Sequence, residues 1–310
     1  MGLSFSVITP SFQQGKFIER TIQSVIDQPV RDLEYIVCDG GSRDETLPIL
    51  KTYSRHLRWI SEPDKGQAHA VNKGLEMTRG EIIAWINSDD IYYPQAFQQV
   101  LDVFENNPNI LVVYGQANWI DKLNGVIAPY PTQPWNYKQL KKECYLCQPA
   151  VFFRRRLVEY SGNLNTKLHY CMDYELWLRY GRVVPFFYLP VKLAGSRLYA
   201  DNKTFSGRLA AHHEANQMLK DQLGYSTRHW IFEYSKLQTE ASHSPDNLKF
   251  IFIVSFVVAG FKNCWHLNKK SILVVLIKIL LYQLSGYNEP STNKQNFDIE
   301  KAMLNRYDQT

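Results

Sequence analysis

The feature that most restricts how this chain can fold is an alternation of short apolar runs with helix-like segments over its first 120 residues. The segments between the runs carry apolar residues at helical spacing. The apolar runs are predicted strands at residues 5–9, 34–38, 58–61, 81–86 and 110–114. Strands that alternate with helices form a mostly parallel sheet with helices on both faces. The sequence therefore predicts an α/β fold.

Two local signals refine this pattern. Ser42, with Glu45 three residues later, has the spacing of a capping box, which predicts a helix from there to about Tyr53. Gly80 stands where the following helix, which starts near Gln67, is expected to end.

Polar clusters follow three of the predicted strands. They are Thr9-Pro10-Ser11, Asp39-Gly40-Gly41 and Asn87-Ser88-Asp89-Asp90. Ligands of such sheets bind at the carboxyl ends of the strands, so we expect these clusters to converge on one site.

The acidic residues of these clusters suit a metal and a nucleotide. Asp89 and Asp90 are hard oxygen ligands that could hold Mg²⁺ or Mn²⁺ together with a diphosphate, although such a stretch also occurs as a plain polar turn. Asp39 could accept hydrogen bonds from a ribose, or could be a turn residue. Asp173 could be a base, or an acid that stabilises the first turn of a helix.

Several classes of protein are disfavoured. The sequence contains no G-x-S-x-G, Walker or G-x-G-x-x-G motif, which argues against hydrolases, NTPases and dehydrogenases. The net charge is +5, and residues 249–310 account for four of it, with eight Lys or Arg against four Asp or Glu. A nearly neutral body with a basic tail, without a Lys/Arg stripe, does not predict binding to nucleic acid.

The cysteines indicate a reducing compartment. The five of them have irregular spacing, and the single C-x-x-C pair, Cys144 and Cys147, has no second pair or nearby His to complete a zinc site. With no evident signal peptide, we expect a cytoplasmic protein, with the inner face of the cell membrane as the other expected location.

Four parts of the sequence together resemble glycosyltransferase family 2, over about residues 4–205. They are 6–25, 34–46, 61–74 with 86–90, and 148–155 with 172–179. Each part is a weak signal alone, but their order and spacing make the combined signal strong.

The resemblance implies a GT-A fold and an inverting transfer from a nucleotide-diphosphate sugar, with a uridine nucleotide as the expected donor. It implies Asp173 as the general base and Asp89, with Asp90 beside it, as the metal position. The implied donor-binding residues are Thr9, Pro10, Ser11, Asp39, Lys65, Asn87, Ser88 and Asp89, and the acceptor-binding residues are Gln148 and Trp177.

Three residues depart from the family pattern. Asn87 replaces the first acid of the D-x-D-like motif, Met172 replaces the acid before Asp173, and Tyr199 stands where relatives often have a His. An active enzyme of cell-surface glycan assembly is the main prediction, and a catalytically silent protein that binds nucleotide sugars is the alternative. A nucleotidyltransferase is disfavoured, because residues 9–16 lack a glycine-rich basic loop.

The chain is predicted to comprise a catalytic domain at 1–205, with a donor half at about 1–120 and an acceptor half at 121–205, and a helical extension at 206–310. The extension carries apolar blocks at 250–261 and 272–284, separated by a stretch with lysines and Trp265. These blocks could pack on the body, on a second copy in a homodimer, or lie in a membrane surface through residues 249–284. The last case would favour a glycan or lipid-linked acceptor.

Overall fold

A computed structural model describes residues 3–199, 201–242 and 249–285 of the chain. The chain divides into two compact units. The first comprises Met1–Tyr137 and Tyr145–Ala200, and the second Lys138–Cys144 and Asp201–Thr310. The assignment of catalysis to residues 1–205 and of a separate role to the extension stays a prediction.

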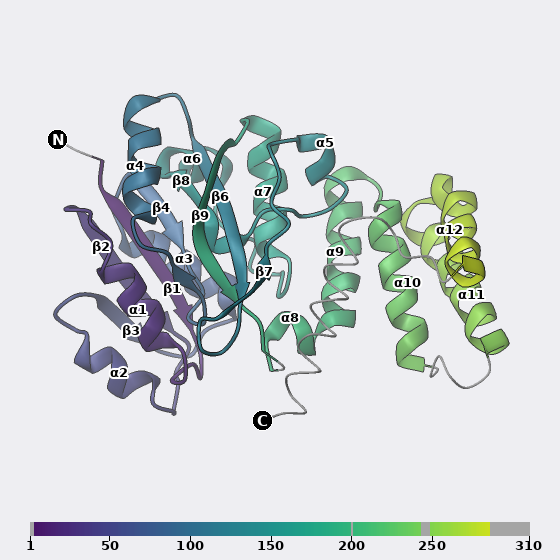
Figure 1. Cartoon of the computed structure of the whole chain (residues 1–310), viewed down its shortest axis with the longest axis horizontal. Helices are drawn as coiled ribbons and strands as arrows, with labels where there is room; N and C mark the ends of the chain where they lie inside the picture. The colour runs from purple at the N-terminus through teal and green to yellow at the C-terminus, as the bar shows by residue number, and fades with distance from the viewer. Residues whose placement is uncertain (1–2, 200, 243–248, 286–310) are drawn as a thin grey trace. The chain divides into compact units, whose positions relative to one another are not determined.

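The first unit is built on one curled sheet (Figure 1). In the described residues its strands follow the order β3-β2-β1-β4-β8-β6-β9-β5, with β7 paired to β6. The strands are β1 (Phe5–Ser11), β2 (Leu33–Asp39), β3 (Arg58–Ser61), β4 (Ile82–Trp85), β5 (Ile91–Tyr92), β6 (Val112–Ile120), β7 (Val126–Pro129), β8 (Val151–Arg154) and β9 (Phe187–Arg197). The predicted α/β class is confirmed.

Pairing directions explain how one edge of this sheet collects polar residues. β3, β2, β1 and β4 are parallel, as the sequence predicted. β8 is antiparallel to both β4 and β6, and β9 is parallel to β6, so β6 and β9 run in the same direction as β1. The carboxyl end of β9 therefore lies at the same edge as those of β1, β2 and β4.

Helices cover both faces of the sheet, because alternate residues of a strand point to opposite sides. On β1, Phe5 and Val7 belong to the core that α1 (Ile18–Ile26) and α4 (Ala96–Asn106) cover. On the other side, Ile8 meets Gly74 of α3 (Gln67–Met77), so closely that Gly74 has no room for a side chain. The remaining helices of this unit are α2 (Thr46–Thr52), α5 (Tyr137–Leu140), α6 (Arg155–Ser161), α7 (Met172–Val183) and the 3₁₀ turn η1 (Gln148–Ala150).

Stacked aromatic rings fill the first of these cores. The rings of Phe5 and Phe97 are stacked with centroids 5.0 Å apart, and Tyr92 and Phe152 pack edge-on against Phe97. All four side chains are buried, and each contributes about 1.5–3 kcal/mol through its removal from water. This core fixes β1, β4 and β8 side by side beneath the polar edge.

One local prediction is wrong. Helix α2 begins at Thr46, and Ser42 does not cap it. The Ser42 hydroxyl instead donates to Asp39 Oδ1 at 2.5 Å and accepts from the Gln13 N–H at 2.7 Å. The Gln13 N–H thus takes the place that a helix N–H would have on the Ser42 oxygen, and the charge-assisted bond to Asp39 fixes the hydroxyl in that orientation.

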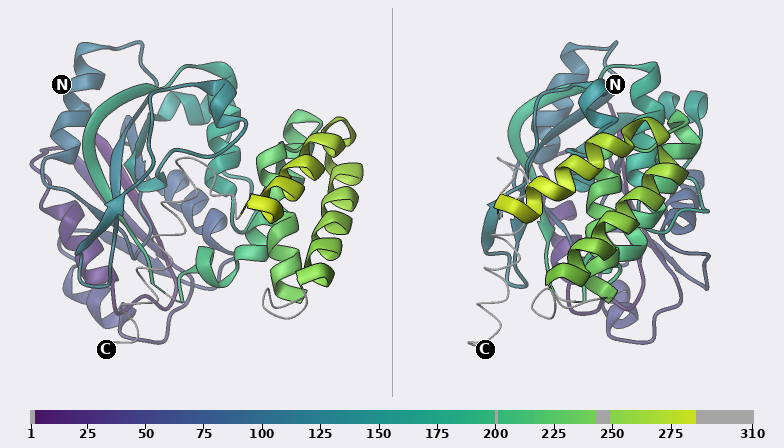
Figure 2. Two further views of the ribbon diagram at one scale, coloured as in Figure 1. Left: turned by 45° about the vertical axis from the view of Figure 1, so that its right-hand side comes forward. Right: turned by 90° about the vertical axis from the view of Figure 1, so that its right-hand side faces the viewer.

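The second unit is helical. Its elements are α8 (Lys203–Ser206), α9 (Arg208–Leu223), α10 (Arg228–Ser242), α11 (Lys249–Leu267), the 3₁₀ turn η2 (Lys269–Ser271) and α12 (Ile272–Ser285). Helices α11 and α12 lie side by side and pack on α10 (Figure 2). The polar stretch 239–242 lies at the end of α10, and residues 243–248 are outside the described residues. In the described part of the chain, every helix falls short of the length and apolar character needed to span a membrane.

Gly80 lies at the sheet edge opposite the carboxyl ends of the strands, where it packs against the start of β1. A substitution at Gly80 therefore tests how tightly this edge is packed. A Cβ atom at this position would lie 2.6–2.7 Å from the carbonyl carbon of Phe5 and from the N and Oγ atoms of Ser6. Since the strand backbone cannot yield easily, Gly80→Ala should lower the free energy of unfolding by about 1–3 kcal/mol in urea denaturation. Glu76→Ala, at an exposed position nearby, is the matched control and should leave the midpoint unchanged.

Candidate active site at the carboxyl edge of the sheet

Asp39, at the end of β2, organises the turn that follows it. Its Oδ2 accepts from the N–H groups of Gly41 (3.0 Å) and Ser42 (2.8 Å) and from the Ser61 hydroxyl (2.6 Å). With the Ser42 hydroxyl on Oδ1, the carboxylate receives four hydrogen bonds and is only 2% exposed. Four hydrogen bonds use most of the acceptor capacity of a carboxylate. Asp39 thus shapes the turn, and its contact with a nucleotide stays a prediction.

The end of β1 lies directly beside this turn. Ser11 pairs with Asp39 in the strand register, and its carbonyl accepts from the Gly40 N–H. A Cβ on Gly40 would lie 2.9 Å from the Asp64 carboxylate and 3.3 Å from the Phe12 ring, so only glycine fits between them. The Ser11 hydroxyl is buried without a hydrogen-bond partner among the described residues, and Phe12 is 59% exposed. This edge therefore offers a free hydroxyl and an open aromatic ring.

The end of β4 is held by amide side chains. The Asn87 carbonyl oxygen accepts from Gln67 Nε2 at 2.6 Å and from Trp85 Nε1 at 3.1 Å. Gln148 donates from Nε2 to the Trp85 carbonyl at 2.6 Å. With two lone pairs, the amide oxygen satisfies both N–H donors, so Asn87 links α3 to the end of β4. Asn87 is half-buried and Ser88 is buried.

Asp89 is the acidic residue of this edge that stays partly accessible. Its Oδ2 accepts from the Tyr199 hydroxyl at 2.9 Å, and its main-chain carbonyl accepts from Arg197 Nε at 2.6 Å. Tyr199 is itself held by the Phe17 ring, with centroids 4.8 Å apart, and by Gln14 at 3.5 Å. Tyr199, which follows β9, thus fixes the orientation of the Asp89 carboxylate.

Asp90 faces the protein interior instead. It is 4% exposed, and its Oδ1 accepts from the Arg197 backbone N–H at 2.7 Å. Burial, followed by the charge of Asp89, raises the pKa of the Asp90 carboxyl well above its usual range. The Asp90 carboxylate thus joins β4 to β9, and its predicted role as a metal ligand stays a prediction.

The chemistry of this donor set fits a divalent cation. Burial raises the pKa of the Asp89 carboxyl, and the Tyr199 hydrogen bond opposes that rise. The nearby guanidinium of Arg197 donates hydrogen bonds to the carbonyls of Asp89 and Asp121 and to the Asn124 side chain. Among the described residues no group of three or more His, Cys, Asp or Glu side chains could hold a metal. A cation here would therefore rest on Asp89 and on ligands from a diphosphate and water.

Asp173 stands in the first turn of α7 and is half-buried. Its Oδ1 accepts from the Tyr174 N–H at 2.8 Å. The loop before α7 is tied to α3, because the Asn72 side chain exchanges hydrogen bonds of 2.9 and 3.0 Å with the Leu164 backbone. His169 of that loop lies close to Gly66, because a Cβ atom at position 66 would be 3.8 Å from the His169 Nδ1 atom. Met172 is 3% exposed, so its apolar side chain belongs to the core.

Three other residues predicted to contact substrate are packed or hydrogen-bonded within the protein. Thr9 is fully buried, with its hydroxyl 3.1 Å from that of Tyr35, so it presents nothing to a base or ribose. Trp177 is also fully buried, among the rings of Phe153, Tyr180 and Phe186, and offers no surface to an acceptor. Gln148 holds the end of β4 through its Nε2, and its contact with an acceptor stays a prediction.

The remaining predicted donor residues differ in exposure. Pro10 is buried in β1, whereas Lys65 is exposed in the loop that precedes α3. The start of α3 directs backbone N–H groups outward, and a lysine beside such a start suits a phosphate. Phe12, Asp64 and Arg197 were not predicted, although the position of Phe12 directly after the polar end of a strand was a signal that could have drawn attention to it.

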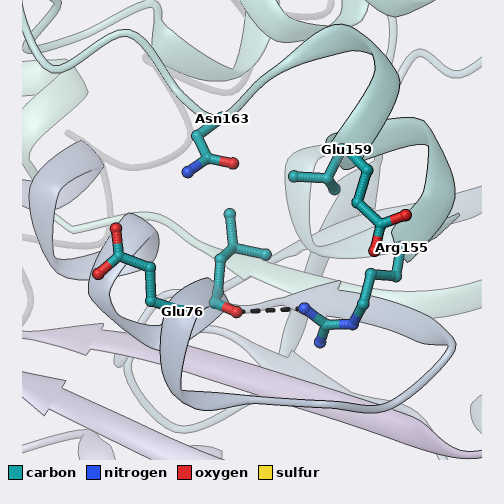
Figure 3. A pocket seen from close by; sticks show the side chains of 6 residues that line it. Glu76, Arg155, Glu159 and Asn163 are labelled. Carbon is teal, nitrogen blue, oxygen red and sulfur yellow. Dashed lines mark hydrogen bonds between the residues drawn. The ribbon is translucent and has the colours of Figure 1, made fainter.

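A separate hollow lies at the opposite edge. It measures about 170 Å³ and is lined by Leu75, Glu76, Arg155, Val158, Glu159 and Asn163 (Figure 3). Arg155 donates to the carbonyls of Leu75 and Gly80 and to the Thr78 hydroxyl. Since these bonds hold the end of α3 against β8 and the start of β4, the hollow is a by-product of helix packing rather than part of the candidate site.

Comparison with known sequences identifies the family that this chain resembles. The model of the family described as "Glycosyl transferase family 2" matches residues 6–161, half of the chain. Chondroitin synthase of Escherichia coli is 30% identical over 184 residues, which are 58% of this chain and 27% of that protein. The chain spans between 27% and 65% of the length of three curated relatives that it matches, this synthase among them.

Solved structures agree on the fold. TarS 1–349 of S. aureus, solved in complex with UDP-GlcNAc, has a TM-score of 0.59 at 15% identity and covers 99% of this chain and 92% of that one. The mannosyltransferase PcManGT of Pyrobaculum calidifontis, in complex with GDP-Man and Mn²⁺, has a TM-score of 0.56 at 14% identity, over 93% of this chain and 89% of that one. These likenesses establish a GT-A architecture, as predicted.

The hydrogen bond from Tyr199 to Asp89 can be tested without a substrate. Tyr199→Phe removes a donor from a half-buried carboxylate, so we expect the free energy of unfolding to fall by about 1–3 kcal/mol in chemical denaturation. Tyr160→Phe, at a site that is 78% exposed, is the control and should match the parent. Equal midpoints for the two variants would show that Tyr199 does not hold Asp89.

Proposed function

The chain belongs to glycosyl transferase family 2, and from that premise we propose that it transfers a sugar from a nucleotide-diphosphate donor to an acceptor hydroxyl, with inversion. The observation that carries the proposal is the Asp89 carboxylate, held by Tyr199 at the end of β4 beside a second buried acid. Such an arrangement suits a cation that bridges the protein and a diphosphate.

The nucleoside is proposed to occupy the ends of β1 and β2. Phe12 is the open ring there, and aromatic rings stack on nucleobases. The Ser11 hydroxyl and the remaining lone pair of Asp39 are the polar groups available to the base and ribose. Lys65, at the start of α3, would face the diphosphate.

Asp89 is the residue proposed to hold Mg²⁺ or Mn²⁺. When bound, such a cation offsets the negative charge that builds up on the departing diphosphate. Tyr199 and Arg197 keep Asp89 oriented from either side, through its carboxylate and its carbonyl. Preorganised ligands spare the site the reorganisation that a mobile carboxylate would need.

Asp173 is proposed to act on the acceptor. In the transfer, the acceptor oxygen forms a bond to the anomeric carbon while the bond from that carbon to the diphosphate oxygen breaks. The carboxylate of Asp173 takes the proton that the acceptor hydroxyl loses. Because attack comes from the face opposite the diphosphate, the configuration at the anomeric carbon is inverted.

The substrate class is a further part of the proposal. A UDP-sugar is the proposed donor, supported by the fold likeness to a protein solved with UDP-GlcNAc, and a GDP-sugar is the natural comparator, since the other likeness was solved with GDP-Man. A glycan or lipid-linked acceptor, in polysaccharide assembly on the cytoplasmic side of a membrane, is proposed from the similarity to chondroitin synthase. Residues 249–284 stay the proposed contact with a membrane or with a second copy.

The proposed base gives the sharpest test of activity. Asp173→Asn should lower donor turnover, measured as nucleotide release with Mn²⁺ present, by about a hundredfold to ten-thousandfold. Donor binding, measured by calorimetry, should stay unchanged because Asp173 faces the acceptor. Asp102→Asn, at an exposed site of α4, is the control. Binding without turnover in the parent protein would favour the catalytically silent alternative.

The proposed stacking ring is tested by affinity. Phe12→Ala should weaken the binding of UDP by about fivefold to a hundredfold, since it removes the stacking surface. Leu123→Ala, at a site that is 80% exposed, removes a similar apolar side chain elsewhere and should have no effect. Titration calorimetry with UDP and GDP would measure the affinity of both variants. An unchanged affinity for Phe12→Ala would contradict the proposal that the base stacks on this ring.

A further inference from the structure

Helices α11 and α12 of the second unit expose an apolar surface. It comprises Val254, Val258, Phe261 and Trp265 of α11 and Leu273, Ile277 and Leu280 of α12, which we call the outer face. Their exposed fractions run from 44% at Val254 to 70% at Leu273. Concentrated exposure of large apolar side chains marks a surface that meets another molecule or a membrane.

The spacing of these residues shows that the outer face is a continuous feature of each helix. The α11 members follow one another by four, three and four residues, and the α12 members by four and three, which places each set along one side of its helix. The opposite side of each helix is already covered. Phe256 and Cys264 of α11, with Val275 and Ile279 of α12, are buried in a core shared with α10. Each helix is therefore apolar on two sides, one packed on protein and one open.

The two helices that carry the outer face also pack closely on each other. Gly260 of α11 faces Ile279 of α12 so tightly that a Cβ on Gly260 would lie 2.4 Å from the Ile279 Cδ1 atom. Figure 2 shows the two helices side by side in both views. The two stripes of the outer face therefore lie on neighbouring helices of one bundle.

Positive charge borders this surface. Residues 249–285 include five lysines and no aspartate or glutamate. Lys262, Lys269 and Lys270 are exposed at the end of α11 and in the turn to α12. The Lys269 ammonium lies 4.5 Å from the Trp265 ring centroid, and Phe261 stacks on the same indole. A shallow hollow of about 300 Å³ is lined by Phe261, Lys262 and Trp265, so apolar and cationic groups share one place.

We propose that the outer face docks on an anionic lipid bilayer. Its apolar side chains would enter the boundary between head groups and acyl chains, and the lysines would reach the lipid phosphates through their flexible stems. Trp265 suits the boundary itself, because its indole is apolar with one polar N–H. The helices would lie along the surface, since their other sides pack on α10. This goes beyond glycosyl transfer, and it would hold the proposed enzyme at a membrane.

Charge is what favours a membrane over a second copy of the chain. In a two-fold dimer the same patch meets itself. Lysines that border this patch would therefore face the border of the same patch on the other copy, where the segment supplies further lysines and no acidic residue. Like charges placed opposite one another cost several kcal/mol. An anionic bilayer instead supplies negative charge all along the border.

The test is sedimentation of the full chain with vesicles. With vesicles of phosphatidylcholine and phosphatidylglycerol, the parent should bind, and it should bind more weakly to phosphatidylcholine alone or in 0.5 M salt. The double variant Trp265→Ser, Leu273→Ser should lower the partition constant by at least about tenfold. The pair Lys262→Glu, Lys270→Glu should lose a similar factor on anionic vesicles only.

Controls separate this proposal from misfolding and from dimerisation. Leu123→Ser makes the same kind of change at an exposed site of the first unit and should bind vesicles like the parent. Circular dichroism and nucleotide binding should be unchanged in all variants, since every substituted side chain is exposed. Failure of the parent to bind anionic vesicles would overturn the proposal, whether or not the enzyme is active. So would a lipid-free dimer that the Trp265→Ser, Leu273→Ser variant converts to monomer.

Discussion

A single buried guanidinium, that of Arg197, ties together the edge of the sheet on which the candidate site depends. The Arg197 side chain is fully buried, lies over the Phe17 ring, and donates to the carbonyls of Asp89 and Asp121 and to Asn124. Its own backbone N–H is held by Asp90. A buried cation is stable only when its donors are satisfied and opposite charge is near. The ends of β4 and β9 and the β6–β7 turn must therefore stay in place together.

Contacts of this kind, between residues distant in sequence, limit how much of the site the sequence could reveal. Strand periodicity and the parallel order predicted that residues 9–11, 39–41 and 87–90 would meet at one edge, and the strand pairing shows that they do. The sequence pattern could not show which of these side chains would face outward. Thr9 and Asp90 lie at strand ends like Ser11 and Asp89, but one pairs with Tyr35 and the other with the Arg197 backbone. Those partners come from elements distant in sequence, so periodicity does not identify them.

The helical extension is a second case in which the sequence predicts the elements but not which side chains are exposed. The apolar blocks at 250–261 and 272–284 predicted two helices, and α11 and α12 contain them. An apolar side chain looks the same in sequence whether it packs on protein or remains open. Only the burial of Phe256 and Val275, against the exposure of Trp265 and Leu273, separates the packed side from the outer face. The structure then shows that lysines border the outer face, which composition alone does not reveal.

The departures from the family pattern form one consistent set. With Asn87 in place of an acid, the end of β4 keeps two carboxylates instead of three, and one of them, Asp90, accepts from the backbone of β9. A histidine at position 199 could share in binding a cation, whereas the Tyr199 hydroxyl donates its hydrogen bond to Asp89. The protein then contributes one oriented carboxylate, and a cation bound there needs the diphosphate to complete its coordination. Metal and donor should consequently bind with strong mutual dependence, because each supplies the ligands or charge that the other lacks.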